Sequence, residues 1–196
     1  MHELGAQEKN EILVGLLRAL DLHGPGERGH AERVAVYAVA TGYELGLRDQ
    51  DLVDLRYGAT LHDVGKVKVD ASLVRKLGKL DEGEIEAMRL HAELSLELLN
   101  GFEWLAPCLP MIIHHHERWD GAGYPVGLAG DLIPLGARII SVAETFDVLT
   151  TDAGWKIPID DEEARKEVDS CAGSQFDRRV VEAFLKVQPL IQPIGV

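Results

Sequence analysis

Two adjacent imidazoles, two carboxylates and a glycine-rich turn lie within eleven residues near the middle of the chain. The run is His115-His116-Glu117-Arg118-Trp119-Asp120-Gly121-Ala122-Gly123-Tyr124-Pro125. Neutral imidazole and carboxylate are the usual nitrogen and oxygen ligands of divalent transition metals. Such a polar run is poorly suited to a hydrophobic core. The sequence therefore predicts that a metal is coordinated here.

Three upstream segments carry further groups of the same kind. His62 and Asp63 are adjacent, His91 stands alone in an apolar-periodic stretch, and His30 opens another such stretch. Any one of these histidines, taken alone, is better explained as exposed or as packed in a core. Four separate segments with ligand-type side chains instead favour one shared site.

Phosphoester hydrolysis is the chemistry that such a ligand set can perform. Two divalent ions about 3.5–4 Å apart can hold the attacking and the leaving oxygen of an in-line phosphoryl displacement. Asp63 is the natural bridge between two ions, since a carboxylate has two oxygens and its neighbour His62 can bind one ion. Such mixed ligand sets suit iron, manganese, nickel or zinc better than magnesium or calcium. Lys66 can stabilise a phosphate oxygen, although a lysine at a helix end is also favoured by the helix dipole.

The elements that must position these residues are predicted to be helical nearly throughout. Apolar residues recur at three- and four-residue steps, and Asp81 with Glu84 forms a capping-box pattern at the start of one helix. Glycine-rich or basic loops are expected over 66–79 and 118–130. Helices are predicted over 1–22, 31–45, 51–62, 81–99, a short stretch ending at 115–116, 135–149, and two helices within 161–187.

These predicted helices place the candidate ligands at their ends or on their inner faces. His30 falls in a first helical turn, His62 and Asp63 follow a buried helix that Gly65 is expected to stop, and His91 faces inward. His115 and His116 fall on a last turn. Two further carboxylates, Glu144 and Asp147, lie in an apolar helix, where burial is costly unless they are paired or bound to a metal.

The complete pattern resembles the signature of HD-GYP domains, the metal-dependent phosphodiesterases that degrade the bacterial messenger cyclic di-GMP. The resemblance rests on His62-Asp63-Val64-Gly65-Lys66, on His91, and on His115-His116-Glu117 followed by Asp120-Gly121 and Gly123-Tyr124-Pro125, and it extends from about Gly29 to about Phe184. It implies an all-α, single-domain helical bundle with a metal site between central helices. Residues 23–196 would form this phosphohydrolase domain, and residues 1–22 a helix that packs on it or leads to a linker.

The resemblance also implies a role for each motif residue. His30, His62, Asp63 and Glu144 would hold a first ion, and Asp63, His91, His115 and His116 a second, with iron or manganese as the metals. Asp63 and Lys66 would be catalytic, and Lys66, Lys156 and Arg118 would bind substrate. Glu117 and Asp120 are expected to orient the ligating imidazoles. Gly121, Gly123, Tyr124 and Pro125 would form a loop that shapes the domain and contacts a signalling partner, with plain packing as the alternative for Tyr124.

The chain departs from the family pattern at several positions. Glu144 stands where the family has aspartate, Asp70 replaces a frequent proline, and Gly26 replaces a glutamate with which some members hold a third ion, so two ions are expected. Ala153 and Lys156 stand where the family carries arginines that help hold substrate phosphate. Lysine lacks the bidentate guanidinium, and alanine makes no such contact.

The leading prediction is hydrolysis of cyclic di-GMP to the linear dinucleotide pGpG and on to GMP. The alternatives are an HD-type phosphohydrolase for another cyclic dinucleotide or nucleotide, favoured by the missing arginines, and a catalytically poor signalling module that binds cyclic dinucleotides. The full ligand set argues against the last alternative. Neither the metal nor the oligomeric state nor the regulatory input follows from the sequence.

The composition fits this interpretation and excludes other classes. A chain of 196 residues with 46% hydrophobic residues fits one domain. The balance of 20 basic against 33 acidic residues, a net charge of −13, argues against DNA or RNA as partners. The two cysteines, Cys108 and Cys171, are expected to be reduced. Without an apolar stretch that could span a bilayer or a secretory signal, the protein is expected to be cytoplasmic and not inserted in a membrane.

Overall fold

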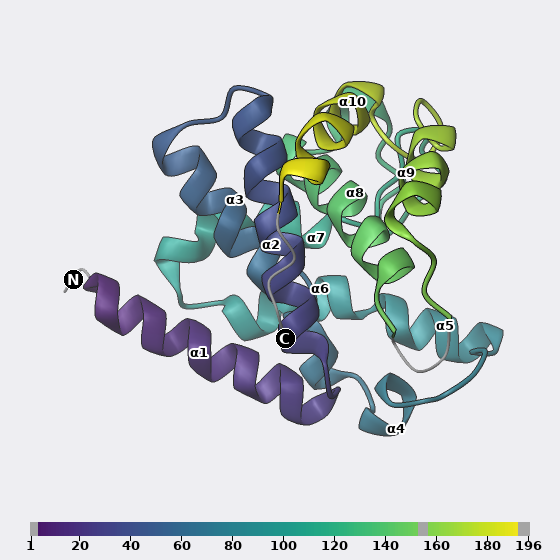
Figure 1. Cartoon of the computed structure of the whole chain (residues 1–196). Coiled ribbons are helices and arrows are strands. Elements are labelled where there is room, and N and C mark those ends of the chain that lie inside the picture. The colour runs from purple at the N-terminus through teal and green to yellow at the C-terminus, as the bar shows by residue number, and fades with distance from the viewer. Residues whose placement is uncertain (1–3, 153–156, 192–196) are drawn as a thin grey trace.

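The described part of the chain folds entirely into helices and connecting loops. The structure is a computed structural model, and it describes residues 4–152 and 157–191. Within these residues there are ten α-helices, four short 3-10 helices and no β-strand (Figure 1). The all-α prediction is confirmed. None of the described helices is both long and apolar enough to cross a membrane.

Most of the helices follow one another with short connections, and a long loop over 114–129 joins α7 to η3. The first half of the chain contains α1 (Ala6–His23), α2 (Glu27–Glu44), α3 (Asp49–Leu61), η1 (Val64–Lys68), α4 (Ala71–Val74), α5 (Glu82–Arg89) and α6 (His91–Leu99). The second half contains η2 (Glu103–Cys108), α7 (Leu109–Ile113), η3 (Gly130–Leu132), α8 (Leu135–Thr150), α9 (Asp161–Ser170), α10 (Arg178–Val187) and η4 (Gln188–Leu190).

The main core lies between α2, α3, α8 and α10. Helix α2 runs through the middle of the molecule and packs against the other three (Figure 1). Three aromatic rings at its centre, those of Tyr37, Phe146 and Phe184, meet at centroid distances of 5.2–5.9 Å in edge-on or tilted arrangements. Since aromatic pairs of this geometry add to the hydrophobic stabilisation, they fix α8 and α10 against α2.

A second apolar cluster packs together helices that carry or precede several of the candidate ligands. It is built from buried residues of α3, η1, α6, η2 and α7, and Leu13 and Leu16 of α1 pack against it. Helix α1 also packs against α2 and η1. The N-terminal helix predicted over 1–22 therefore packs on the bundle, beside α2 and beside η1, which follows His62 and Asp63.

The stretch predicted as one helix over 81–99 is two helices. The capping box between Asp81 and Glu84 is present, with hydrogen bonds of 2.8 and 2.9 Å. The chain breaks at Leu90, however, and no residue of α5 is buried; even its apolar residue Ile85 is exposed. Helix α5 lies at the edge of the molecule (Figure 1), and only α6 presents an apolar face to the core.

Gly65 does not stop a helix as predicted; it permits two segments to touch. Helix α3 already ends at Leu61, and Gly65 lies inside η1. A Cβ atom on Gly65 would come within 1.9 Å of the His91 carbonyl oxygen, and its N–H donates to Ser95 Oγ at 3.1 Å. This contact holds η1 against the start of α6 and thereby brings Asp63 next to His91. The predicted 66–79 loop also contains the end of η1 and all of α4.

Replacing Gly65 by alanine is expected to destabilise the fold, because the added methyl group meets backbone rather than a movable side chain. Overpacking of this kind costs about 1–3 kcal/mol. Gly15→Ala is the matched control: Gly15 is exposed in the middle of α1 with nothing within 4 Å of an added Cβ, and the change should stabilise by about 0.5–1 kcal/mol. Urea unfolding of both variants measures the difference, and equal stabilities would contradict this reading of Gly65.

Candidate metal centre

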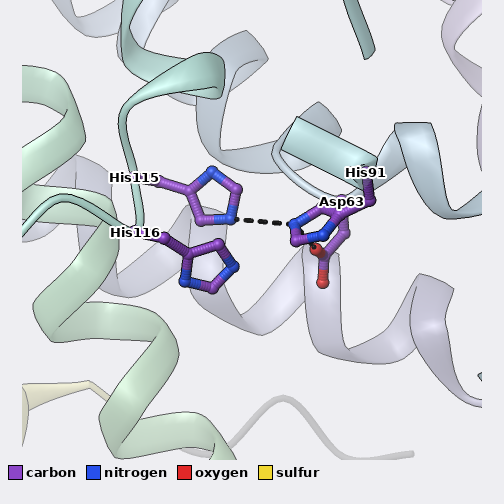
Figure 2. Close-up of side chains that lie close together, drawn as sticks. All are labelled: Asp63, His91, His115 and His116. Atoms are coloured by element: carbon purple, nitrogen blue, oxygen red, sulfur yellow. Dashed lines mark hydrogen bonds and ion pairs between the residues drawn. The ribbon is translucent and has the colours of Figure 1, made fainter. Parts of the chain in front are cut away.

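Seven side chains predicted as metal ligands converge from five helices. His30 lies on α2, His62 and Asp63 follow α3, His91 begins α6, His115 and His116 follow α7, and Glu144 lies on α8. They form two groups in which the candidate ligand atoms lie within 4.8 Å of one another: Asp63, His91, His115 and His116, and His30, His62, Asp63 and Glu144. Figure 2 shows the first group, with Asp63 and His91 facing His115 and His116.

Asp63 belongs to both groups, and each of its oxygens faces one of them. Its Oδ1 lies 3.2 Å from His91 Nε2. Its Oδ2 lies 3.2 Å from His62 Nε2 and 3.8 Å from His30 Nε2. A buried carboxylate in this position has the geometry of a bridging ligand, which is the role predicted for it.

Hydrogen bonds at Nδ1 turn four imidazoles so that their Nε2 atoms face inward. His62, His91 and His115 each donate Nδ1–H to the carbonyl oxygen three residues earlier, at 2.6–2.7 Å. His30 instead donates to Asp147 at 2.7 Å. Since carbonyl and carboxylate oxygens can only accept, each Nδ1 carries a proton, and Nε2 is the atom left to bind a metal.

The ring of His116 is held by Tyr124 rather than by a hydrogen bond. The two rings stack at a centroid distance of 4.7 Å and an interplanar angle of 24°. Gly123 makes this return of the chain possible, because a Cβ atom there would lie 2.4 Å from the Arg118 amide nitrogen and 2.6 Å from the His116 carbonyl oxygen. The Gly123-Tyr124-Pro125 loop therefore forms one wall of the site.

Two of the candidate imidazoles are neutral near pH 7, as metal ligands must be. Burial lowers the pKa of His115 well below its usual value and that of His116 to about 4. Burial opposes the charge on His62, but the adjacent Asp63 carboxylate raises the pKa of His62 to about 9, so a metal ion would have to displace a proton from His62. His62 Nε2 and both Asp63 oxygens are buried without a hydrogen bond of normal geometry. Buried polar atoms seldom stay unsatisfied, and a divalent ion would satisfy these three.

Lys66 provides a positive charge at the edge of this cluster. Its Nζ lies 2.7 Å from Asp63 Oδ2 and 3.1 Å from both oxygens of Glu27. Burial raises the pKa of Asp63, but the charge of Lys66 and the His62 imidazole outweigh it and hold that pKa well below its usual value. Asp63 is therefore ionised, as a bridging ligand must be.

Asp147 is a functional candidate that was not predicted as a site residue. Its sequence position indicated only a carboxylate that is costly to bury. Its carboxylate accepts Nδ1–H of His30 at 2.7 Å and two hydrogen bonds from the Arg33 guanidinium, at 2.6 and 2.9 Å. Burial acts to raise its pKa, but these hydrogen bonds hold the pKa of Asp147 below the usual value. The carboxylate thus stays ionised and orients His30. The apolar surroundings of Asp147 and its place three residues after Glu144 were the only sequence signal.

The expectation that Glu117 and Asp120 orient the ligating imidazoles is wrong. Buried Glu117 accepts hydrogen bonds of 2.8–3.1 Å from the backbone N–H groups of Val126, Gly127 and Leu128, so it fastens the loop after Tyr124. Asp120 accepts from Arg118 and from the Ala122 amide.

Of the other predicted substrate-binding residues, Arg118 is engaged elsewhere. Its guanidinium binds Asp120 and the Gln175 side chain, joining the 118–122 turn to the segment before α10. This arrangement differs from the predicted contact with substrate. Lys156 lies outside the described residues, as does Ala153.

Comparison with known proteins identifies the family of the chain. The model of the HD domain matches residues 16–180. The chain belongs to the HD domain family. The resemblance drawn from its motif is thereby confirmed, and the two histidine and carboxylate groups lie at the positions that the motif predicted.

Curated relatives of this HD domain are phosphodiesterases of cyclic dinucleotides. It is 34% identical to the 3′3′-cGAMP-specific phosphodiesterase 2 of Vibrio cholerae over 92% of this chain and 35% of that protein. It is also 34% identical to the cyclic di-GMP phosphodiesterase response regulator RpfG of Xanthomonas campestris over 99% of this chain and 52% of that protein. The chain thus spans about a third to a half of these relatives.

The fold is also that of a solved phosphodiesterase. The crystal structure of a cyclic GMP-AMP-specific phosphodiesterase of V. cholerae superposes with a TM-score of 0.68 at 21% identity, covering 91% of this chain and 48% of that one. At this identity the likeness concerns the fold, and it confirms the predicted HD-type helical bundle.

Changing Asp147 to asparagine tests the support of His30 in this HD domain. The amide keeps the shape but lacks the charge that accepts from His30 and pairs with Arg33, so we expect Mn²⁺ affinity to fall about 10- to 100-fold. Calorimetric titration of chelator-treated protein measures the affinity, and circular dichroism checks the fold. Asp54→Asn, which alters an α3 carboxylate bonded to Gln50, is the control. An unchanged affinity in Asp147→Asn would refute the orienting role.

Proposed function

We propose that this HD domain is a metal-dependent phosphodiesterase that hydrolyses cyclic di-GMP to the linear dinucleotide pGpG. The observation that carries the proposal is the pair of ligand groups joined by Asp63, since one buried carboxylate with an oxygen toward each group suits a centre of two ions. The names of the curated relatives support a cyclic dinucleotide as the substrate class.

We assign the two ions to the ligand sets inferred from the sequence. His30, His62, Asp63 and Glu144 would hold one ion, and Asp63, His91, His115 and His116 the other. Five imidazoles and two carboxylates suit iron, manganese, nickel or zinc better than magnesium or calcium, and the family resemblance implies iron or manganese among these. Bound there, two such ions supply Lewis-acid activation of the phosphoryl group and a hydroxide at neutral pH.

The residues of the chain contribute orientation and charge. Asp63 stays ionised because Lys66 and His62 lie beside it, and backbone carbonyls and Asp147 keep the Nε2 atoms aimed at the centre. Lys66, held by Glu27 and Asp63 and still partly exposed, is placed to donate to a nonbridging phosphate oxygen, where negative charge grows in the transition state.

A second candidate is the same reaction on 3′3′-cGAMP. It is favoured by the relative of that specificity, which matches 92% of this chain. Cyclic di-GMP and 3′3′-cGAMP differ in one base, whereas the ligand groups and Lys66 would face the phosphodiester that both share. The proposed metal chemistry therefore applies equally to either substrate.

Product analysis over time tests the proposal. Protein purified without oxygen and loaded with Fe²⁺ or Mn²⁺ is expected to convert cyclic di-GMP to pGpG, with any later GMP seen in the same time course. The same assay with 3′3′-cGAMP compares kcat/KM for the two substrates. Asp63→Asn should reduce product to the level without protein, because the carboxylate that joins the two ligand groups is lost.

Asp54→Asn serves as the matched control and should retain full activity. Metal-loaded protein that binds cyclic di-GMP without forming any product would overturn the enzymatic proposal in favour of a binding module. Product that appears equally with Asp63→Asn would show that this centre is not the site of the reaction.

A further inference from the structure

We propose that Arg89 binds the substrate phosphate that does not lie at the ligand cluster. This inference rests on the proposed function, since it concerns a cyclic dinucleotide with two phosphodiester groups. Arg89 is the last residue of α5, two positions before the candidate ligand His91.

The position of Arg89 follows from two contacts of the Tyr124 ring. The His116 ring stacks on the Tyr124 ring at a centroid distance of 4.7 Å, and the Arg89 guanidinium lies over the Tyr124 ring at 5.1 Å from its centroid. A guanidinium on an aromatic face is held in plane while its N–H groups stay available at the edge. Arg89 is thus attached to the wall of the site through the same ring that contacts His116.

Among the described residues, two other cations at the site, Lys66 and Arg33, form ion pairs that are much less open to water. Lys66 is 19% exposed and contacts Asp63 and Glu27, and Arg33 is 21% exposed and bidentate on Asp147. The Arg89 side chain is 46% exposed. Within the described part of the chain it pairs with Glu86, which is 69% exposed, at an Nη1–Oε1 distance of 2.7 Å. An ion pair so open to water contributes little and yields readily to a better ligand.

A phosphate is such a ligand. The guanidinium fork matches two phosphate oxygens, and charge-assisted bonds of this kind are stronger than an exposed pair with a flexible glutamate. An anionic substrate depends on local positive charge, because the chain carries a net charge of −13. With one phosphodiester at the ligand cluster, the second phosphate of the ring would reach Arg89, which lies over the Tyr124 ring that stacks on His116.

The test is the kinetics of Arg89→Gln and Arg89→Lys on cyclic di-GMP with metal-loaded protein. Loss of a charge-assisted contact should raise KM about 10- to 100-fold in Arg89→Gln, with kcat within about threefold of the original. Arg89→Lys should recover part of the loss, since it restores charge without the fork. Metal content and melting temperature should stay unchanged, which separates substrate binding from support of Tyr124 and His116.

Two controls match the change in charge. Lys166→Gln removes a cation that also forms an exposed pair within one helix, with Glu162, and should leave KM unchanged. Glu86→Gln removes the competing partner of Arg89 and should leave KM unchanged or lower it. A KM for Arg89→Gln equal to the original value overturns the proposal, as does a fall in kcat accompanied by lost metal.

Direct binding separates this proposal from the proposed reaction. Cyclic di-GMP is titrated into Asp63→Asn and into Asp63→Asn with Arg89→Gln. Weaker binding by the double variant supports the role of Arg89 even where the original protein forms no product. Equal binding by both variants rejects it, and absence of binding by the original protein rejects both proposals.

Discussion

The buried charge of Asp63 is the constraint on which the rest of the site depends. A carboxylate taken out of water is costly unless cations or hydrogen-bond donors surround it. Here the compensation comes from different parts of the chain: Lys66 on η1, His62 at the end of α3, and His91 at the start of α6. These segments can surround one carboxylate only if η1 touches α6, and the missing side chain of Gly65 allows that contact.

Helix ends provide the second element of the design. The last carbonyl groups of an α-helix have no partner within the helix. Ala59, Met88 and Ile112 lie in the last turns of α3, α5 and α7, and their carbonyl oxygens accept the Nδ1–H groups of His62, His91 and His115. One hydrogen bond thus satisfies a helix terminus and orients a candidate ligand.

The sequence predicted the identity of the candidate ligands better than their supports. His62, Asp63, His91 and the His115-His116 pair are recognisable because their chemistry is unusual for a helical bundle. Helical periodicity predicted α8 to within one residue and the outer ends of the α9–α10 pair. The helix break at Leu90 could not be predicted, because the apolar spacing continues through it.

Closeness in sequence does not show which way a side chain points. Glu117 directly follows two candidate ligands, yet its carboxylate points to the backbone of residues 126–128. Asp147 is distant from His30 in sequence and binds it directly. The contact of Glu117 depends on how the loop after it folds back. The contact of Asp147 with His30 depends on how α8 packs against α2.

The loop after His116 shows how the backbone and the cluster are coupled. Glu117 fixes residues 126–128, Gly123 lets the chain pass against the His116 carbonyl, and between them Tyr124 is pressed onto the His116 ring. The loop that the family resemblance associates with partner contacts is therefore also the support of a candidate ligand. A partner that displaced Tyr124 would remove the ring on which His116 stacks and leave it in contact with the His115 and His91 rings, at centroid distances of 3.9 and 5.1 Å. Because the Arg89 guanidinium also lies over the Tyr124 ring, one aromatic ring links the position of a candidate ligand to that of an exposed cation.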